Sequence, residues 1–132
     1  MRSLTSVLLS SIYAYQTLNL SHPAPIATYT HPDLRLKGFY IRIDVSPCSQ
    51  YLVSGSTDGG VYMWDTADRH SPAVRLEGHQ REASAVSFGN DKVASASDDL
   101  SVRLWRFDPA TSRRLTADSS LAKTYGGACA HS

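Results

Sequence analysis

The stretch YLVSGSTDGGVYMWDT, residues 51–66, decides the fold because it holds two short apolar runs joined by a glycine turn. Residues 51–56 and 60–64 mix β-branched and aromatic residues with small ones, a composition that favours strands. Between them stands Thr57-Asp58-Gly59-Gly60, and Asp-Gly between two apolar runs is a strong hairpin signal. The stretch therefore predicts a β-hairpin.

The same hairpin returns 41 residues later, where LVSGSTDGGVYMWD aligns with VASASDDLSVRLWR. The polar and aromatic residues that match at this offset are Ser54 with Ser95, Ser56 with Ser97, Asp58 with Asp99, and Trp64 with Trp105. Val61 also matches Val102. Several matches at one spacing identify an internal repeat, and a period of about 40 residues is typical of the four-stranded blades of β-propellers.

Other segments supply candidate strands around the two hairpins. FYIRIDV (39–45) alternates, and we expect Ile41, Ile43 and Val45 on one face of a strand. In ASAVSF (83–88), the residues expected near the core are Ala83, Ala85 and Phe88. AVRLE (73–77) follows the first hairpin as a candidate fourth strand.

The chain as a whole has 132 residues, 42% of them hydrophobic, which suits a single globular domain. We predict an all-β fold, a partial propeller of about two blades plus one strand over residues 10–107, with repeats at about 33–66 and 77–107. The extra strand is SIYAYQ (11–16), with Tyr15 in the place of the tryptophan. Residues 1–9 form an N-terminal segment without a clear assignment, and the polar, aperiodic residues 108–132 predict a disordered tail. Because two blades and a strand cannot close a ring, we expect a piece of a larger propeller.

Charge and composition argue against several functional classes. The net charge of +1 provides no field for nucleic acid or membrane binding. No run approaches the ~20 apolar residues of a membrane helix. The glycine stretch SGSTDGG lacks the Lys-Ser/Thr of a phosphate loop, and the histidines show no metal-ligand spacing. We therefore expect no cofactor, metal or small-molecule ligand. A single pair of cysteines, Cys48 and Cys129, does not indicate a secreted disulfide scaffold, so we expect an intracellular chain.

A trio of His79, Ser95 and Asp99 raises the alternative of a hydrolase. The nucleophile elbow G-x-S-x-G is absent from the sequence, and Ser95 alternates within a predicted strand. Part of the trio is also repeated every 41 residues, and packing devices are repeated along a chain more often than catalytic sites. The sequence therefore favours a structural role and a protein that is not an enzyme.

Gly78-His79, Ser95, Asp99 and Trp105, together with Trp64-Asp65, give the chain its resemblance to the WD-repeat family. The resemblance implies a hydrogen-bonded chain in which Trp105 donates to Ser95, Ser95 to His79, and Asp99 holds His79. It also implies that Asp99→Ala destabilises the second blade. The first repeat has Ser54, Asp58 and Trp64 but lacks a plain Gly-His. Its network either uses His31 or lacks the histidine, and both alternatives remain open.

A narrower resemblance comes from the order SIYAYQTLNL, IATYTH and FYIRIDVSPCSQYLVSGSTDGGVYMWDT, which is similar to the last blades of the denticleless family. This resemblance implies a nuclear, or cytoplasmic, substrate receptor of a cullin–RING ubiquitin ligase in cell-cycle and DNA-replication control. Such a receptor docks on a propeller adaptor and presents chromatin-bound substrates. Adaptor-binding repeats often carry Trp-Asp-x-Arg, whereas here Ala67 and Arg106 break that pattern. The alternatives are a generic WD-repeat scaffold of another complex, or a truncated propeller fragment without independent function.

Overall fold

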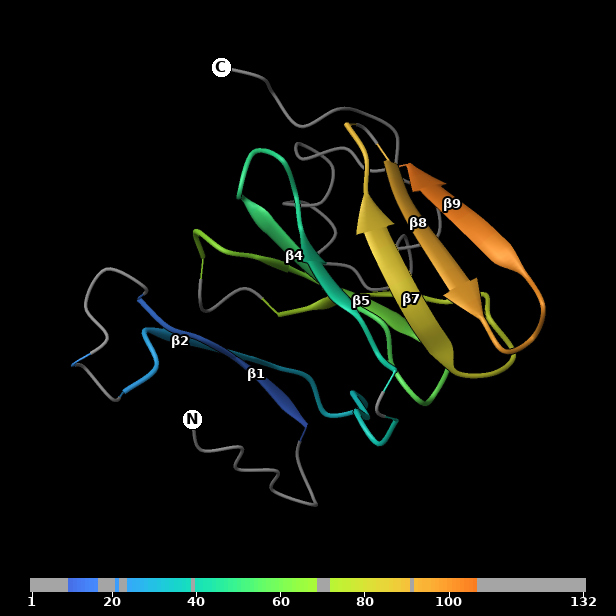
Figure 1. Ribbon diagram of the computed structural model, residues 1–132, viewed down its shortest axis with the longest axis horizontal. Helices are drawn as coiled ribbons and strands as arrows, with labels where there is room; N and C mark the ends of the chain where they lie inside the picture. Colours follow the sequence, from blue (N-terminus) through green and yellow to red (C-terminus); the bar gives the residue numbers. More distant parts are fainter. Residues whose placement is uncertain are drawn as a thin grey trace.

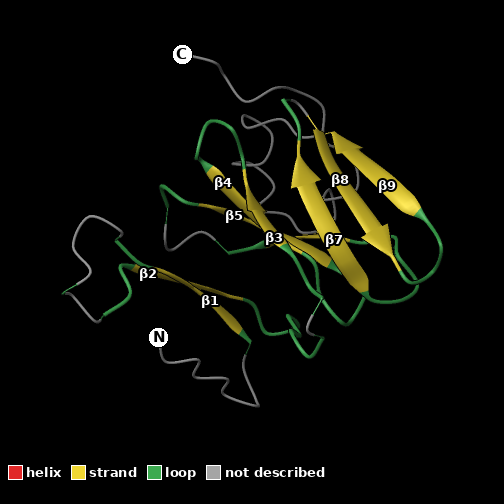
Figure 2. Cartoon of the chain, viewed as in Figure 1, coloured by secondary structure: helices red, strands yellow, loops and turns green. Residues whose placement is uncertain are grey.

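The computed structural model describes residues 10–16, 21, 24–38, 40–68, 72–90 and 92–106 (Figure 1). This described part contains nine β-strands and no helix, so the predicted all-β class is confirmed (Figure 2). It accordingly contains no helix long and apolar enough to cross a membrane. The predicted N-terminal segment 1–9 and disordered tail 108–132 lie outside the described residues, and the predicted domain boundaries stay predictions.

The first blade is a four-stranded antiparallel meander with the strand order β3-β4-β5-β6. Its strands are β3 (Ile43–Val45), β4 (Tyr51–Ser54), β5 (Val61–Asp65) and β6 (Val74–Leu76). The predicted hairpin is β4–β5, in which Leu52 pairs with Trp64. Gly59 in its turn has a φ of 88°, a conformation that glycine adopts without strain.

The second blade repeats three of these strands in the order β7-β8-β9. They are β7 (Ala83–Phe88), β8 (Lys92–Ser97) and β9 (Val102–Arg106), and β9 forms the edge of this sheet in Figure 1. In its turn Leu100 takes the position of Gly59 and has a φ of 67°. The prediction of about two blades is thus confirmed.

The strand predicted within residues 11–16 is present, but the prediction that it stands alone is wrong, because it forms an antiparallel pair with a second strand. These are β1 (Ser11–Ala14) and β2 (Ala27–Thr30). β2 could not be recognised from sequence periodicity, because ATYT contains mostly small residues and is flanked by prolines. Tyr15 lies beyond the end of β1 and is exposed, whereas Tyr29 of β2 occupies a buried position.

The first blade lies between the other two sheets, and both of its faces are buried. On one face, residues of β4, β5 and β6 pack on the second blade: Tyr51, Val53, Val61, Met63 and Leu76 contact Ala83, Val86 and Val93. On the other face, residues of β4 and β5 pack on β1, β2 and the following loop: Leu52, Tyr62 and Trp64 contact Ile12, Tyr29 and Leu34. This sandwich explains why β4 and most of β5 are buried without alternation.

β3 begins only at Ile43, and Ile43 and Val45 are 52% and 48% exposed. The prediction that Ala85 lies near the core is wrong. Ala85 is also exposed, because a β-bulge between Ala83 and Ala85 shifts the register. Val86 takes the inward place after the bulge.

Candidate functional site

The second blade brings together four side chains that lie far apart in the sequence. His79 comes from the loop before β7, Ser95 from β8, and Trp105 from β9. Trp105 Nε1 donates to Ser95 Oγ at 2.8 Å, and Ser95 Oγ lies 2.7 Å from His79 Nε2. Because an indole N–H can only donate, the consistent arrangement has Ser95 donating in turn to His79 Nε2. His79 Nδ1 then donates toward Asp99, whose Oδ2 lies 3.2 Å away.

Asp99 gathers more donors than the sequence analysis foresaw. Its carboxylate accepts from the hydroxyl and the backbone N–H of Ser101 and from the backbone N–H of Gln80. These hydrogen bonds, the Ser101 hydroxyl first, hold the pKa of Asp99 well below its usual range. Ser101 also lies 3.0 Å from His79 Nδ1, and it was missed because it has no matching residue in the first repeat, where Gly60 stands.

The corresponding three residues of the first blade are not brought together. Ser54 Oγ donates to the carbonyl of Gly55 at 2.8 Å, and Trp64 Nε1 donates to the carbonyl of Thr30 at 3.1 Å. The expected network of Ser54, Asp58 and Trp64 is therefore wrong for this blade. The physical reason is the missing Gly-His, because without the imidazole nothing bridges Ser54 to Asp58, and each group takes a nearer partner.

His31 does not complete that network. Its Nδ1 accepts from the backbone N–H of Asp33 at 3.0 Å, and its ring packs against Tyr62 with the ring centroids 4.8 Å apart. Burial lowers the pKa of His31 below 6.5, and Arg75 adds to this effect although Asp33 opposes it. The neutral ring that this favours is the form in which Nδ1 can accept a hydrogen bond.

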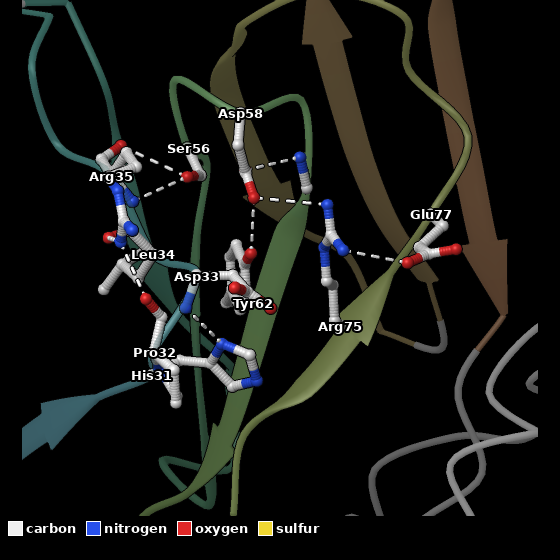
Figure 3. Close-up of polar contacts among 11 residues, drawn as sticks. His31, Pro32, Asp33, Leu34, Arg35, Ser56, Asp58, Tyr62, Arg75 and Glu77 are labelled. Atoms are coloured by element: carbon white, nitrogen blue, oxygen red, sulfur yellow. Dashed lines mark hydrogen bonds and ion pairs between the residues drawn. The ribbon is translucent and has the colours of Figure 1, made fainter.

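A second polar cluster forms around Asp58 instead (Figure 3). The Tyr62 hydroxyl donates to Asp58 Oδ2 at 2.7 Å, and Arg75 Nη2 lies 3.2 Å from the same oxygen. Arg75 Nη1 also lies 2.9 Å from Glu77 Oε1, and its guanidinium stands 5.9 Å from the centre of the Tyr62 ring. The cluster thus joins the β4–β5 turn, β5 and β6.

Protonation in this cluster follows from its hydrogen bonds. Burial raises the pKa of Asp58, but the hydrogen bonds from Tyr62 and Gly60 and the charge of Arg75 outweigh it and keep the pKa below 3.8. Burial and the Asp58 carboxylate both raise the pKa of Tyr62. Tyr62 therefore stays a hydroxyl donor and Asp58 a carboxylate acceptor at neutral pH.

Ser56 makes hydrogen bonds that its alignment with Ser97 did not predict. Its hydroxyl accepts from Arg35 N at 2.9 Å and donates to Arg35 O at 3.1 Å. It therefore fixes the loop before the first blade to the end of β4.

An open cleft of about 270 Å³ lies between Asp58, Gly60, Arg75 and Glu77 on one side and Gly78–Gln80 on the other. Both of its acidic side chains are paired with Arg75. Across the described ranges, no three side chains of the metal-binding types are grouped to hold an ion. Ser95 is only 1% exposed, so its hydroxyl is not presented to a substrate. The geometry thus suits joining strands and loops.

Comparisons with known proteins agree with this architecture. The WD domain, G-beta repeat family matches residues 25–65 and 70–106. A denticleless protein homolog of Danio rerio is 35% identical over 102 residues, covering 74% of this chain and 15% of the relative. Denticleless protein homolog A of Xenopus laevis is 40% identical over 85 residues, covering 62% of this chain and 11% of the relative.

Another relative is the cell division cycle protein cdt2 of Schizosaccharomyces pombe, which is 34% identical over 102 residues, covering 73% of this chain and 21% of the relative. The chain thus spans about a tenth to a fifth of the length of the curated relatives it matches. Among solved structures, the computationally designed Ika4 protein matches with a TM-score of 0.43 and 25% identity, covering 62% of this chain and 54% of that chain. Because the repeat model covers more than half of the sequence, the chain belongs to the WD-repeat family.

Proposed function

We propose that this chain is part of a substrate-receptor subunit of a cullin–RING ubiquitin ligase that acts in cell-cycle and DNA-replication control. The observation that carries the proposal is the similarity of this chain to denticleless proteins, with 35% identity over 102 residues to the Danio rerio homolog. The name of the Schizosaccharomyces pombe relative, a cell division cycle protein, supports the same process. The partners would be the propeller adaptor of the ligase and chromatin-bound substrates, and the site of action would be the nucleus.

The proposed subunit is not an enzyme. The polar groups that resemble a catalytic trio are engaged in the interior, where the Ser95 hydroxyl contacts both Trp105 and His79. We infer that His79, Ser95, Asp99 and Trp105 brace the second blade, and that the Asp58–Tyr62–Arg75 cluster does so in the first. This leaves the outer surfaces of the blades for binding proteins.

A second candidate is a WD-repeat scaffold of a different complex. It is favoured by the sequence after each tryptophan, because neither Trp64-Asp65-Thr66-Ala67 nor Trp105-Arg106 contains Trp-Asp-x-Arg. Under this alternative the protein still binds proteins through its blades, but without the cullin adaptor.

Affinity purification separates the two candidates. The full gene product that contains this chain is tagged, isolated under native conditions, and its partners are identified by mass spectrometry. Recovery of the adaptor together with the cullin supports the ligase subunit, provided that a tagged β-propeller of another family does not recover them. Recovery of another stable assembly without the adaptor rejects the ligase proposal and favours the second candidate.

A further inference from the structure

The loop that follows β2, residues 31–37, is attached to the first blade by side-chain burial and by backbone hydrogen bonds. The Leu34 side chain is fully buried in the core cluster that it shares with residues of β4 and β5. Arg35 donates its N–H to the Ser56 hydroxyl at 2.9 Å, and its carbonyl accepts from the same hydroxyl at 3.1 Å. The N–H of Lys37 donates to a threonine hydroxyl in the β4–β5 turn at 3.1 Å. These contacts hold the loop against the first blade.

His31 stabilises the first turn of this loop. Its Nδ1 accepts from the backbone N–H of Asp33 at 3.0 Å, and its carbonyl accepts from the N–H of Leu34 at 3.1 Å (Figure 3). The Arg35 guanidinium donates to the carbonyls of Pro32 and Leu34 and so adds a positive charge to the same turn. Because both ring nitrogens of a protonated histidine are donors, Nδ1 can bind the Asp33 N–H only while the ring is neutral.

Charged and titratable groups from three parts of the first blade surround the His31 ring. The ring packs on Tyr62 of β5 with 4.8 Å between the ring centroids, and Arg75 of β6 lies 5.9 Å from the centre of the Tyr62 ring. Asp58 of the β4–β5 turn accepts from Tyr62 and pairs with Arg75. Burial lowers the pKa of His31 below 6.5, and Arg75 lowers it further. The carboxylates of Asp33 and Asp58 raise this pKa but are outweighed, so the surroundings favour the neutral ring.

A proton on His31 therefore disturbs the turn. The new Nδ1–H points at the Asp33 N–H, and two donors without an acceptor between them must separate. A loop in a folded protein already opens part of the time, at a free energy that its own contacts determine. Because the loss of one contact lowers that free energy, protonation increases the fraction of molecules in which the loop is open.

We propose that His31 is a pH-sensitive switch for loop 31–37: uptake of a proton by the imidazole releases the loop from the first blade, while the two blades stay packed on each other. The backbone bond between the blades does not involve His31, because the N–H of Ala83 in β7 donates to the carbonyl of Ser56 at 3.0 Å. Since these backbone groups do not titrate between pH 7 and pH 5, this bond should persist. Release of the loop exposes the Leu34 side chain, so the switch uncovers buried apolar surface in acid.

Amide hydrogen exchange of the full 132-residue chain, resolved by NMR spectroscopy, tests the switch at pH 7 and pH 5. After correction for the intrinsic pH dependence of exchange, the protection of the Arg35 and Lys37 amides should fall roughly threefold or more at pH 5. The Ala83 amide, which lies between the blades, should keep its protection. Unchanged protection at Arg35 and Lys37, or an equal loss at Ala83, would overturn the proposal.

Two substitutions of His31 separate the lost acceptor from other effects of acid. Asparagine can accept from the N–H two residues further on and does not titrate, so His31→Asn should keep the protection of Arg35 and Lys37 equal at both pH values. His31→Phe retains a ring against Tyr62 but has no acceptor, so protection should be low already at pH 7. A loss in acid as large in His31→Asn as in the wild type, or full protection in His31→Phe, would show that the Nδ1 acceptor does not control the loop and would overturn the proposal.

Discussion

Gly59 and Leu100 occupy the same position in two successive hairpins, 41 residues apart, and both have a left-handed φ, of 88° and 67°. Their surroundings are opposite. A Cβ on Gly59 would lie 2.9 Å from the carbonyl oxygen of Arg81, because the loop before the second blade crosses that turn. Leu100 projects into solvent. Close packing therefore requires the left-handed conformation at Gly59 in the first blade. At Leu100 in the second blade the same conformation causes steric strain.

Gly59→Ala should destabilise the protein. The added methyl group both meets the Arg81 carbonyl and disfavours the positive φ, and together these effects should lower the free energy of unfolding by about 1–2 kcal/mol or more. Urea unfolding followed by circular dichroism measures the change. Gly89→Ala is the matched control, since a Cβ there has only an ordinary contact, at 3.6 Å, and its effect should be smaller.

Leu100→Gly should have the opposite sign. Removing the side chain relieves the left-handed strain and sacrifices no buried contact, so the free energy of unfolding should rise by about 0.5–1 kcal/mol. The same unfolding experiment applies. A loss of stability in this variant would show that Leu100 makes contacts that stabilise the folded chain.

Ser95→Ala should destabilise the second blade, because it leaves the Trp105 N–H and His79 Nε2 without their shared partner. The expected loss in the free energy of unfolding is about 1–3 kcal/mol. Ser87→Ala is the control, since Ser87 is exposed on β7 of the same blade, and it should change stability by less than ~0.5 kcal/mol. Combining Ser95→Ala with Trp105→Phe should cost less than the sum of the two single changes, which identifies the hydrogen bond itself.

Tyr62→Phe should weaken the first blade by about 1–2 kcal/mol, because it removes a donor to a carboxylate in a partly buried site. The pKa of Asp58 should rise toward its ordinary value, which a carboxyl NMR titration can follow. Because the folded-state pKa of Asp58 is lowered, its stabilisation is present above the unfolded pKa and is lost as pH falls through the folded pKa. In Tyr62→Phe that acid loss should begin at a higher pH. An unchanged Asp58 titration would contradict the assigned hydrogen bond.

His31 should make the stability of the protein depend on pH closer to neutrality than Asp58 does. Its folded-state pKa lies below 6.5, so the folded chain binds fewer protons than the unfolded chain below that pH. Its contribution is therefore complete above pH 6.5 and declines as pH falls below it. His31→Phe retains a ring against Tyr62 but cannot titrate, and its melting temperature should fall less between pH 7 and pH 5 than that of the wild type. Parallel pH profiles for the two proteins would refute this role.

The hairpins, their 41-residue repetition and the all-β class could be predicted from the sequence because strand alternation and Asp-Gly turns are local signals. β2 was missed because ATYT alternates too weakly to stand out. The exposure of Ile43 and Val45 could not be foreseen, since it depends on how far a neighbouring sheet extends. The position of Ala85 depends on a bulge, which leaves no periodic signal.

The polar network of the second blade was expected because four residues of a known pattern were present, including His79. In the first blade the same reasoning failed because hydrogen-bond partners are decided in three dimensions. The hydroxyl of Tyr62 donates to Asp58, and the β5–β6 register places Arg75 beside both residues. Alignment of the repeats identified the equivalent positions, but it could not identify the hydrogen-bond partners of the residues at those positions.

The two tryptophans have acceptors of different origin, and this fixes the order of the blades along the chain. Trp105 bonds within its own blade to Ser95, whereas Trp64 bonds to the carbonyl of Thr30 in β2, a strand of the preceding sheet. The acceptor for the indole N–H thus comes from the same hairpin in the second blade, whereas in the first blade it comes from the preceding sheet. The repeats are consequently not interchangeable modules. A shuffled chain that moved the first hairpin away from β2 would leave the buried indole N–H of Trp64 without its acceptor.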